Sequence, residues 1–225
     1  KGSGTMTIDG GTTKNIYGNT QDLGLVTIAD TAGNVAIIQD TVTMDTLTIA
    51  GPNARGELPD VTLYINDGES IDNAGIFRIT GAGAGATILS TGPGSFAFTG
   101  NDIDYNGLTV TIGRVNTYDP AVLLGLNETI IVTAGSTFNN TIELNGNNAQ
   151  LTINPGVACA TTNDDVSITN GTVTIGAGGS LDLGTGDITN SGTITSEGAL
   201  LCNDFTSTGT FTNTGANTIE AGGNV

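Results

Sequence analysis

Residues 102–107 carry the residue types and spacing of a calcium-binding loop. Asp102, Asp104 and Asn106 place oxygen atoms at alternate positions, and a Gly follows them. Such ligands before a Gly that permits a sharp turn form the first half of a Ca²⁺ loop. The bidentate Glu expected at the twelfth position is absent, because residue 113 is Gly. Calcium is therefore the one cofactor that the sequence predicts, and the alternative is a strand whose acidic side chains are solvated.

Two further groups of acidic residues could also be considered as calcium ligands. Asp67, Glu69 and Asp72 form a looser cluster of the same kind as residues 102–107. We interpret Asp164 and Asp165 as a solvated corner. A calcium requirement would suit a chain with so much negative charge, because stacked carboxylates repel one another.

Catalysis has little support in the sequence. The chain contains no His, so the Ser-His-Asp and Cys-His arrangements are excluded. Paired carboxylates remain available for glycoside chemistry. Sugar-binding sites, however, usually contain aromatic side chains on which the sugar stacks, and only 4% of the residues are aromatic. We expect a protein that is not an enzyme. The enzyme alternative predicts a groove in which two or more carboxylates converge with an arginine.

The net charge of −17 restricts the possible partners. Only five residues are Lys or Arg and they are scattered, whereas binding to nucleic acid requires clustered cations. No apolar run approaches the ~20 residues of a membrane-spanning helix, so we expect no membrane insertion. Residues 1–11 lack the apolar stretch of a secretion signal, and we expect a mature chain or a fragment of one.

Short strands must position all of these residues. Runs of four to seven residues alternate β-branched and polar side chains between Gly, Asn and Asp; examples are residues 61–65, 108–112 and 172–175. This alternation predicts β-strands. No stretch has the 3.6-residue period of a helix, so we expect almost none.

The strands recur at three positions in a cycle from residue 157 onward. One position reads Val157/Cys159, Leu181/Leu183, Leu200/Cys202, Ile219; the second reads Val166/Ile168, Ile188, Phe205; the third reads Val173/Ile175, Ile194, Phe211. A recurrence of about 20–22 residues with three strands predicts a single-stranded parallel β-solenoid, or β-helix. Each strand would then pair with its equivalents in the coils above and below.

We expect one elongated domain over residues 1–225. Residues 126–225 form the more regular coils, and residues 1–125 are irregular, with corner insertions in the N-terminal half at 50–60, 66–75, 81–94 and 113–127. A β-sandwich over residues 1–125 followed by a solenoid is the rival arrangement.

The two cysteines, Cys159 and Cys202, fall on the same strand position two coils apart. That separation is roughly 9–10 Å, whereas a disulfide needs Cα atoms within ~7 Å. We therefore predict no disulfide and two free buried thiols. A disulfide between them would show that this register is wrong.

Thr-x-Thr pairs recur along the chain, at 41/43, 46/48, 172/174, 193/195 and 210/212. They fall on more than one strand position, and Thr is the best polar strand former on an exposed face. We interpret them in that way. An ordered array that binds ice is the alternative.

Two repeat units stand out in the second half of the chain: TVTIGAGGSLDLG, from residue 172, and SGTITSEG, from residue 191. With such units, the whole chain resembles secreted bacterial β-strand-repeat proteins of the haemagglutinin-like adhesin, autotransporter-passenger and surface-layer types. The resemblance implies an extracellular or cell-surface location and a scaffold or adhesive role, and it carries over no functional residue.

We expect a structural protein that assembles with copies of itself, because an uncapped solenoid end exposes strand edges that invite addition. A fibre or a surface lattice would result. The alternative is an adhesin segment that binds a cell-surface glycan or other ligand without self-assembly.

Overall fold

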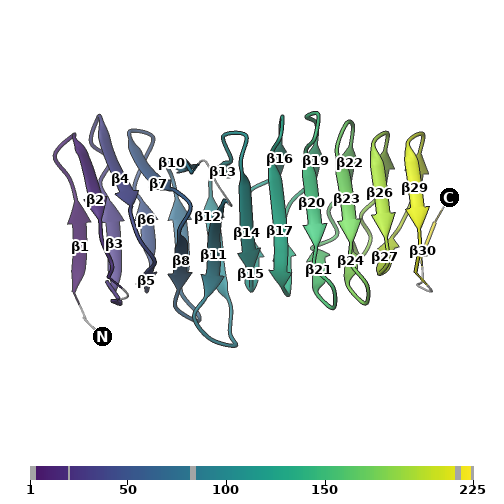
Figure 1. The fold of residues 1–225 in the computed structure, drawn as a ribbon, viewed down its shortest axis with the longest axis horizontal. Coiled ribbons are helices and arrows are strands. Elements are labelled where there is room, and N and C mark those ends of the chain that lie inside the picture. Colours follow the sequence, from purple (N-terminus) through teal and green to yellow (C-terminus); the bar gives the residue numbers. More distant parts are fainter. Residues whose placement is uncertain (1–3, 20, 82–84, 216–218, 224–225) are drawn as a thin grey trace. The chain divides into compact units, whose positions relative to one another are not determined.

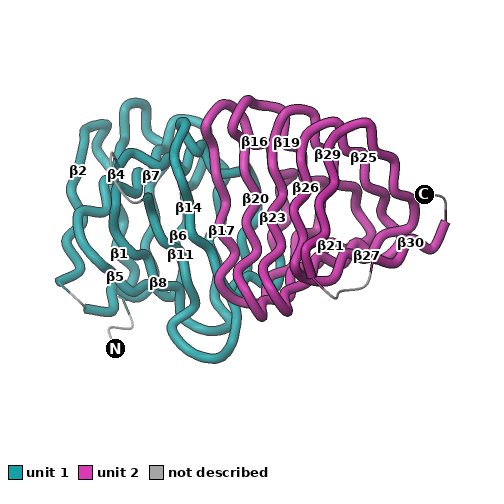
Figure 2. Tube along the Cα trace, turned by 45° about the vertical axis from the view of Figure 1, so that its right-hand side comes forward, with its two compact units in different colours: residues 1–117 teal, residues 118–225 magenta. Residues whose placement is uncertain are grey.

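The computed structural model describes residues 4–19, 21–81, 85–215 and 219–223. Every regular element among these residues is a strand, and none is a helix. The chain divides into two compact units, residues 1–117 and 118–225 (Figure 2). Each is an all-parallel β-solenoid, and together they form about ten coils of ~21 residues. The predicted fold is confirmed, and the parallel pairing excludes the rival sandwich, which is an antiparallel architecture.

Unit 1 contains three parallel sheets, each named here by its first strand (Figure 1). The β1 sheet has the order β1 (Thr5–Ile8), β3 (Leu25–Ile28), β6 (Leu47–Ile49), β9 (Ser70–Asn73), β12 (Phe96–Gly100) and β15 (Val115–Tyr118). The β2 sheet has the order β2 (Thr13–Ile16), β4 (Asn34–Ile38), β7 (Ala54–Leu58), β10 (Ile76–Ile79) and β13 (Ile103–Asp104). The β5 sheet has the order β5 (Val42–Met44), β8 (Thr62–Ile65), β11 (Ala86–Ser90) and β14 (Thr109–Gly113).

Unit 2 repeats the three-sided arrangement. The β16 sheet has the order β16 (Val122–Leu124), β19 (Ile142–Leu144), β22 (Val166–Ile168), β25 (Ile188–Asn190) and β28 (Phe205–Ser207). The β17 sheet has the order β17 (Thr129–Ala134), β20 (Gln150–Ile153), β23 (Thr172–Ile175), β26 (Thr193–Ser196) and β29 (Thr210–Asn213). The β18 sheet has the order β18 (Ser136–Phe138), β21 (Ala158–Thr161), β24 (Ser180–Asp182), β27 (Ala199–Cys202) and β30 (Ile219–Ala221).

The core consists of inward side chains stacked from coil to coil. Successive residues of a strand point to opposite faces, so every second residue is buried. In the β17 sheet the inward residues Ile130, Leu151, Val173 and Ile194 are paired in register, and each is at most 1% exposed. Aromatic rings pack in the same way: Tyr118, the last residue of β15 and the first of unit 2, pairs in register with Phe138, and the two ring centroids are 5.3 Å apart.

The register from residue 157 onward agrees with two of the three predicted strand positions. Val166, Ile188 and Phe205 pair in one column, and Val173, Ile194 and Phe211 pair in another. At the remaining position Leu181, Leu200 and Ile219 pair as predicted. Only its first step was predicted with a shift of two residues, because Cys159, and not Val157, pairs with Leu181. The pattern of inward residues is unchanged by such a shift.

The four stretches predicted as insertions contain strands. They hold β7, β9, β11, β15 and β16, and each of these strands belongs to one of the sheets; residues 82–84 lie outside the described residues. The prediction of whole inserted segments is therefore wrong, because polar strands such as SIDN in β9 hide the apolar alternation. Unit 1 nevertheless has long coils: Ile71 pairs with Phe98, 27 residues later. The extra residues lie in shorter corner segments.

Asparagines hold the corners of the coils. Asn73 and Asn190 are almost completely buried, and their side-chain amides donate to backbone carbonyls of the next coil, Asn73 to Asn101 and Asn190 to Thr210. Asn127 and Asn148 lie one coil apart in the left-handed conformation, each with φ +61°, which Asn tolerates better than most residues. Asn148 Nδ2 donates to Asn127 Oδ1 at 2.9 Å. Such contacts tie successive corners together.

Shortening a side chain in the core column should destabilise the solenoid far more than the same change on its outer face. Leu151 is fully buried between its column neighbours, so Leu151→Ala should lower the free energy of unfolding by about 2–5 kcal/mol. The next residue on β20, Thr152, points outward, and Thr152→Ala should change it by at most ~0.5 kcal/mol. Urea unfolding monitored by circular dichroism measures both. Equal effects of the two variants would contradict the register.

Candidate functional site

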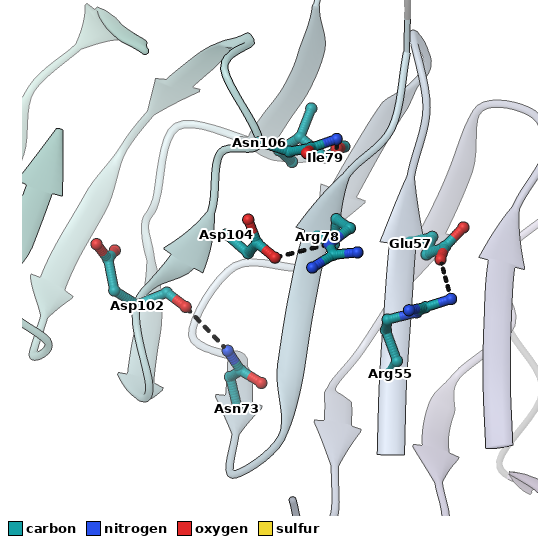
Figure 3. A network of polar contacts seen from close by, with 8 residues as sticks. All are labelled: Arg55, Glu57, Asn73, Arg78, Ile79, Asp102, Asp104 and Asn106. Atoms are coloured by element: carbon teal, nitrogen blue, oxygen red, sulfur yellow. Dashed lines mark hydrogen bonds and ion pairs between the residues drawn. The ribbon is translucent and has the colours of Figure 1, made fainter. Parts of the chain in front are cut away.

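The three residues of the predicted calcium loop lie before, on and after β13 in unit 1. The Asp102 carboxylate accepts a hydrogen bond from its neighbour's amide, Ile103 N, at 2.8 Å and one from the Tyr105 hydroxyl at 3.2 Å. Its backbone carbonyl accepts from Asn73 Nδ2 at 3.3 Å (Figure 3). Asp102 is thus part of the corner that the buried Asn73 organises.

Asp104 and Asn106 have different partners. Asp104 Oδ2 accepts from Arg78 Nε at 2.6 Å, and Asn106 Nδ2 donates to the Ile79 carbonyl at 3.2 Å. Figure 3 shows these side chains directed to separate partners. The three side chains are thus held by separate partners within the fold, and the calcium site stays a prediction. Among the described residues, no group of three or more Asp, Glu or Cys side chains is placed to hold a metal ion.

Charged residues that the sequence analysis left scattered meet on the outer face of the β2 sheet. Parallel pairing places Glu57, Arg78 and Asp104 side by side on β7, β10 and β13. Arg55 Nη2 lies 2.8 Å from Glu57 Oε1 on the same strand (Figure 3). We call these four residues the charge ladder. Its signal in the sequence is the spacing of Glu57, Arg78 and Asp104, which is close to one coil.

The charge ladder places two carboxylates and two guanidinium groups on one sheet face. An acid stacked directly on an acid would be repelled, whereas an opposite charge between them contributes roughly 0.2–1 kcal/mol for each cross-strand pair. Both members of the Arg78–Asp104 pair are 36% exposed, so solvent screens the attraction. Because Arg78 lies between Glu57 and Asp104, these strands can pair without placing one carboxylate directly beside another.

Most of the other acids named in the sequence analysis accept hydrogen bonds at corners. Asp67 accepts from the amides of Gly92 and Gly94, both at 3.1 Å, and from the Ser90 hydroxyl. Asp165 accepts from Asp187 N at 2.8 Å, one coil away. The other two members of the looser cluster have separate partners: Glu69 accepts from Thr46, and Asp72 accepts from Thr99. These carboxylates join neighbouring coils.

The same pattern recurs beyond the residues that the sequence analysis singled out. Asp40 accepts from Gly18 N at 2.7 Å, and Asp187 accepts from Asp204 N at 3.0 Å. In both pairs the donor is a backbone amide of the neighbouring coil. Hydrogen bonds from a backbone amide to a carboxylate are stronger than those between neutral groups. The abundance of Asp therefore has a structural function at the corners.

Acid should weaken the corner that Asp67 holds. The Ser90 hydroxyl is the main cause that lowers the pKa of Asp67 below its ordinary value, and the Gly94 and Gly92 amides contribute. Because the pKa is lower in the folded chain than in the unfolded chain, the stabilisation is present above about pH 4 and is lost as the pH falls through the folded value. Asp67→Asn should lower the melting temperature at neutral pH and reduce its drop in acid.

The measurement is the melting temperature of each variant by circular dichroism, recorded from neutral pH into acid. Glu197→Gln, at an exposed corner position, is the control. It should leave the acid-induced drop unchanged. A drop that is identical in wild type and Asp67→Asn would contradict the role given to Asp67.

Both cysteines of unit 2 are buried and free. Cys159 pairs with Leu181, and Leu181 pairs with Leu200, so Cys202 lies two coils away and two residues further along its strand. This separation is ~12 Å, larger than the sequence analysis expected and beyond the reach of a disulfide. Burial raises the pKa of Cys159 to about 12. Burial, with Asp187 and Asp204 nearby, also raises the pKa of Cys202.

Neither thiol should react readily in the folded protein. The thiolate is the nucleophile, and a raised pKa leaves little of it at mildly alkaline pH. We expect iodoacetamide to label no cysteine of the native chain within minutes, and to label both in denaturant without prior reduction. Mass spectrometry of the alkylated chain measures this. A requirement for a reductant before labelling would reveal a disulfide and contradict the register.

The chain was compared with protein-family models, with curated proteins and with solved structures. None of the three comparisons gives a match. The described residues also contain no helix with the length and apolar character needed to cross a membrane.

Proposed function

We propose that the protein is an extracellular structural element that associates with a second copy of itself through the coil formed by β28, β29 and β30. The observation that carries the proposal is the change in burial at this coil. In the preceding coil Ile188, Ile194 and Leu200 are at most 1% exposed. Their partners in the last coil are half-buried or, for Ile219, 36% exposed.

The end coil presents apolar side chains at inward positions. Phe205, Phe211 and Ile219 continue the three core columns of unit 2. The rings of Phe205 and Phe211 pack edge to face with centroids 5.4 Å apart. Covering such side chains removes apolar area from water, at roughly 25 cal/mol per Å². A second coil placed on this end would therefore be stabilised by the free energy of burying these side chains.

The backbone of the end coil also favours addition. Within the described chain β28, β29 and β30 are the last strands of their sheets and pair on one side only. A row of unpaired N–H and C=O groups is a template for another strand. Backbone pairing and apolar burial therefore act together at this end.

The first coil of unit 1 has different chemistry. Lys14 on β2 pairs with Ala36, which is fully buried, so the lysine occupies an inward position. It lines a hollow of ~440 Å³ together with Met6, Ile8 and Ile16. An inward charge at an edge opposes strand addition, because burying an ammonium group is costly. We therefore propose a paired assembly through the β28–β30 end rather than an unlimited fibre.

The location is part of the proposal. The net charge of −17 with few cleavage points for trypsin-like proteases, and the resemblance to secreted bacterial repeat proteins, support an extracellular or cell-surface role. The parallel ladders would provide a stiff support there. An adhesin segment that binds a ligand without self-association is the alternative, and it predicts a chain that stays monomeric.

Sedimentation velocity over a range of concentrations, with electron microscopy of the same samples, tests the association. Wild type should form pairs in a concentration-dependent manner, and Phe205→Lys should weaken pairing because it places a charge at the inward position of β28. Thr206→Lys is the matched control, because it adds the same charge at the adjacent outward position.

Pairing that weakens only in Phe205→Lys would support the proposal. A wild type that is monomeric at every concentration, or equal pairing by both variants, would contradict it and favour the adhesin alternative. Long filaments would show that the Lys14 end also joins and would overturn the limit placed on assembly.

A further inference from the structure

The outer face of the β17 sheet in unit 2 is composed almost entirely of threonine. The outward residues of its five strands form two columns that follow the register of the sheet. One column reads Thr129, Gln150, Thr172, Thr193, Thr210, and the other reads Ile131, Thr152, Thr174, Thr195, Thr212. Eight of these ten positions are Thr. We call this surface the threonine face.

The sequence pattern predicts the Thr-x-Thr pairs on more than one strand position, and one pair, Thr46 and Thr48 at β6, does lie in another sheet. The three pairs of unit 2 nevertheless fall on three adjacent strands, β23, β26 and β29, in perfect register. Gln150 and Thr152 on β20 continue the two columns. Folding therefore collects pairs that the sequence leaves dispersed.

The threonine face is regular in two dimensions. Adjacent strands of a parallel sheet are ~4.8 Å apart, and outward residues along a strand are ~6.6 Å apart. Figure 1 shows β17, β20, β23, β26 and β29 side by side and nearly parallel. These two repeats are close to the distances between water oxygens on a face of an ice crystal. A flat grid of side chains at such spacings matches a solid surface better than a small molecule.

The grid is held rigidly from below. The inward residues between the threonines, such as Leu151, Val173 and Ile194, are at most 1% exposed and stack in the core column. Threonine itself is β-branched, so its side chain has few conformations. The threonine side chains therefore lose little conformational entropy when the face binds an ordered surface.

The threonine hydroxyls are available to bind water. In the part of the chain that the structure describes, none of the eight hydroxyls on this face hydrogen-bonds to another protein group. Threonines elsewhere do have such partners: Thr31 donates to Asp9, Thr99 to Asp72 and Thr162 to Asn139. The contrast separates the threonine face from threonines that serve the corners.

The threonine face also carries no charge, in a chain whose net charge is −17. The outward residues of the other two sheets of unit 2 are mixed and include Leu123, Glu143, Ser167, Thr189 and Thr206, and Thr137, Ala160, Asp182, Leu201 and Glu220. The preference of threonine for exposed strands would enrich all three sheets. It does not explain why threonine is concentrated on one of them.

We propose that the threonine face binds ice. Each threonine offers a hydroxyl that joins the water lattice and a methyl group around which water is caged, whereas a charge would hold its own liquid-like shell. Single contacts are weak, but a rigid array makes many at once, so adsorption is strong in the way that multivalent binding is strong. Bound protein would then hinder growth of the crystal between adsorbed molecules.

The test measures binding of the full chain to ice. We expect a gap between the melting and freezing temperatures of a seed crystal, and accumulation of a fluorescently labelled chain on a growing ice hemisphere. The double variant Thr174→Tyr, Thr195→Tyr should abolish both effects, because the rings disrupt the grid. Tyr is itself a good strand former, so the sheet should persist, which circular dichroism checks.

Thr189→Tyr is the matched control, because Thr189 points outward on β25 in the β16 sheet. It should adsorb to ice as wild type does. The proposal is overturned if wild type is excluded from ice as an inert protein of the same size is, or if the double variant adsorbs as strongly as wild type. Neither outcome depends on whether the chain pairs through its β28–β30 end.

Discussion

In-register parallel pairing between successive coils is the constraint on which the rest of the structure depends. It places each residue beside its equivalent one coil away, so side chains of one kind form columns. Leu151 lies between Ile130 and Val173, and Tyr118 stacks on Phe138. Each coil can therefore reuse the same packing contacts, which explains why the sequence repeats short motifs of Thr, Val and Ile.

The same stacking brings like charges together, and the chain manages this in two ways. In unit 1 a guanidinium stands between carboxylates, as Arg78 does between Glu57 and Asp104. At the corners, carboxylates such as Asp67 and Asp187 accept backbone amides of the neighbouring coil. Acidic residues that suggest metal ligands in the sequence thereby form hydrogen bonds and ion pairs within the fold.

Outer surfaces and ends differ in chemistry although the core is uniform. The β28–β30 end is apolar at its inward positions, whereas Lys14 occupies an inward position in the first coil of unit 1. The β17 sheet of unit 2 exposes a neutral threonine face, whereas its neighbours expose acids and leucines. Because in-register pairing repeats one residue type along an outward column, a solenoid can make one face chemically uniform while the inward core residues stay unchanged.

The sequence by itself determined the class of fold, the absence of helix and the length of a coil, because alternation and recurrence are local properties of the chain. It did not determine register. Coil lengths vary from 17 residues, between Ile188 and Phe205, to 27, between Ile71 and Phe98, and a shift of two residues leaves the same side chains inward. For that reason Cys159 was aligned with Cys202 rather than with Leu200. Only the tertiary structure decided which residues one coil apart are neighbours, and it brought together both the charge ladder and the threonine face.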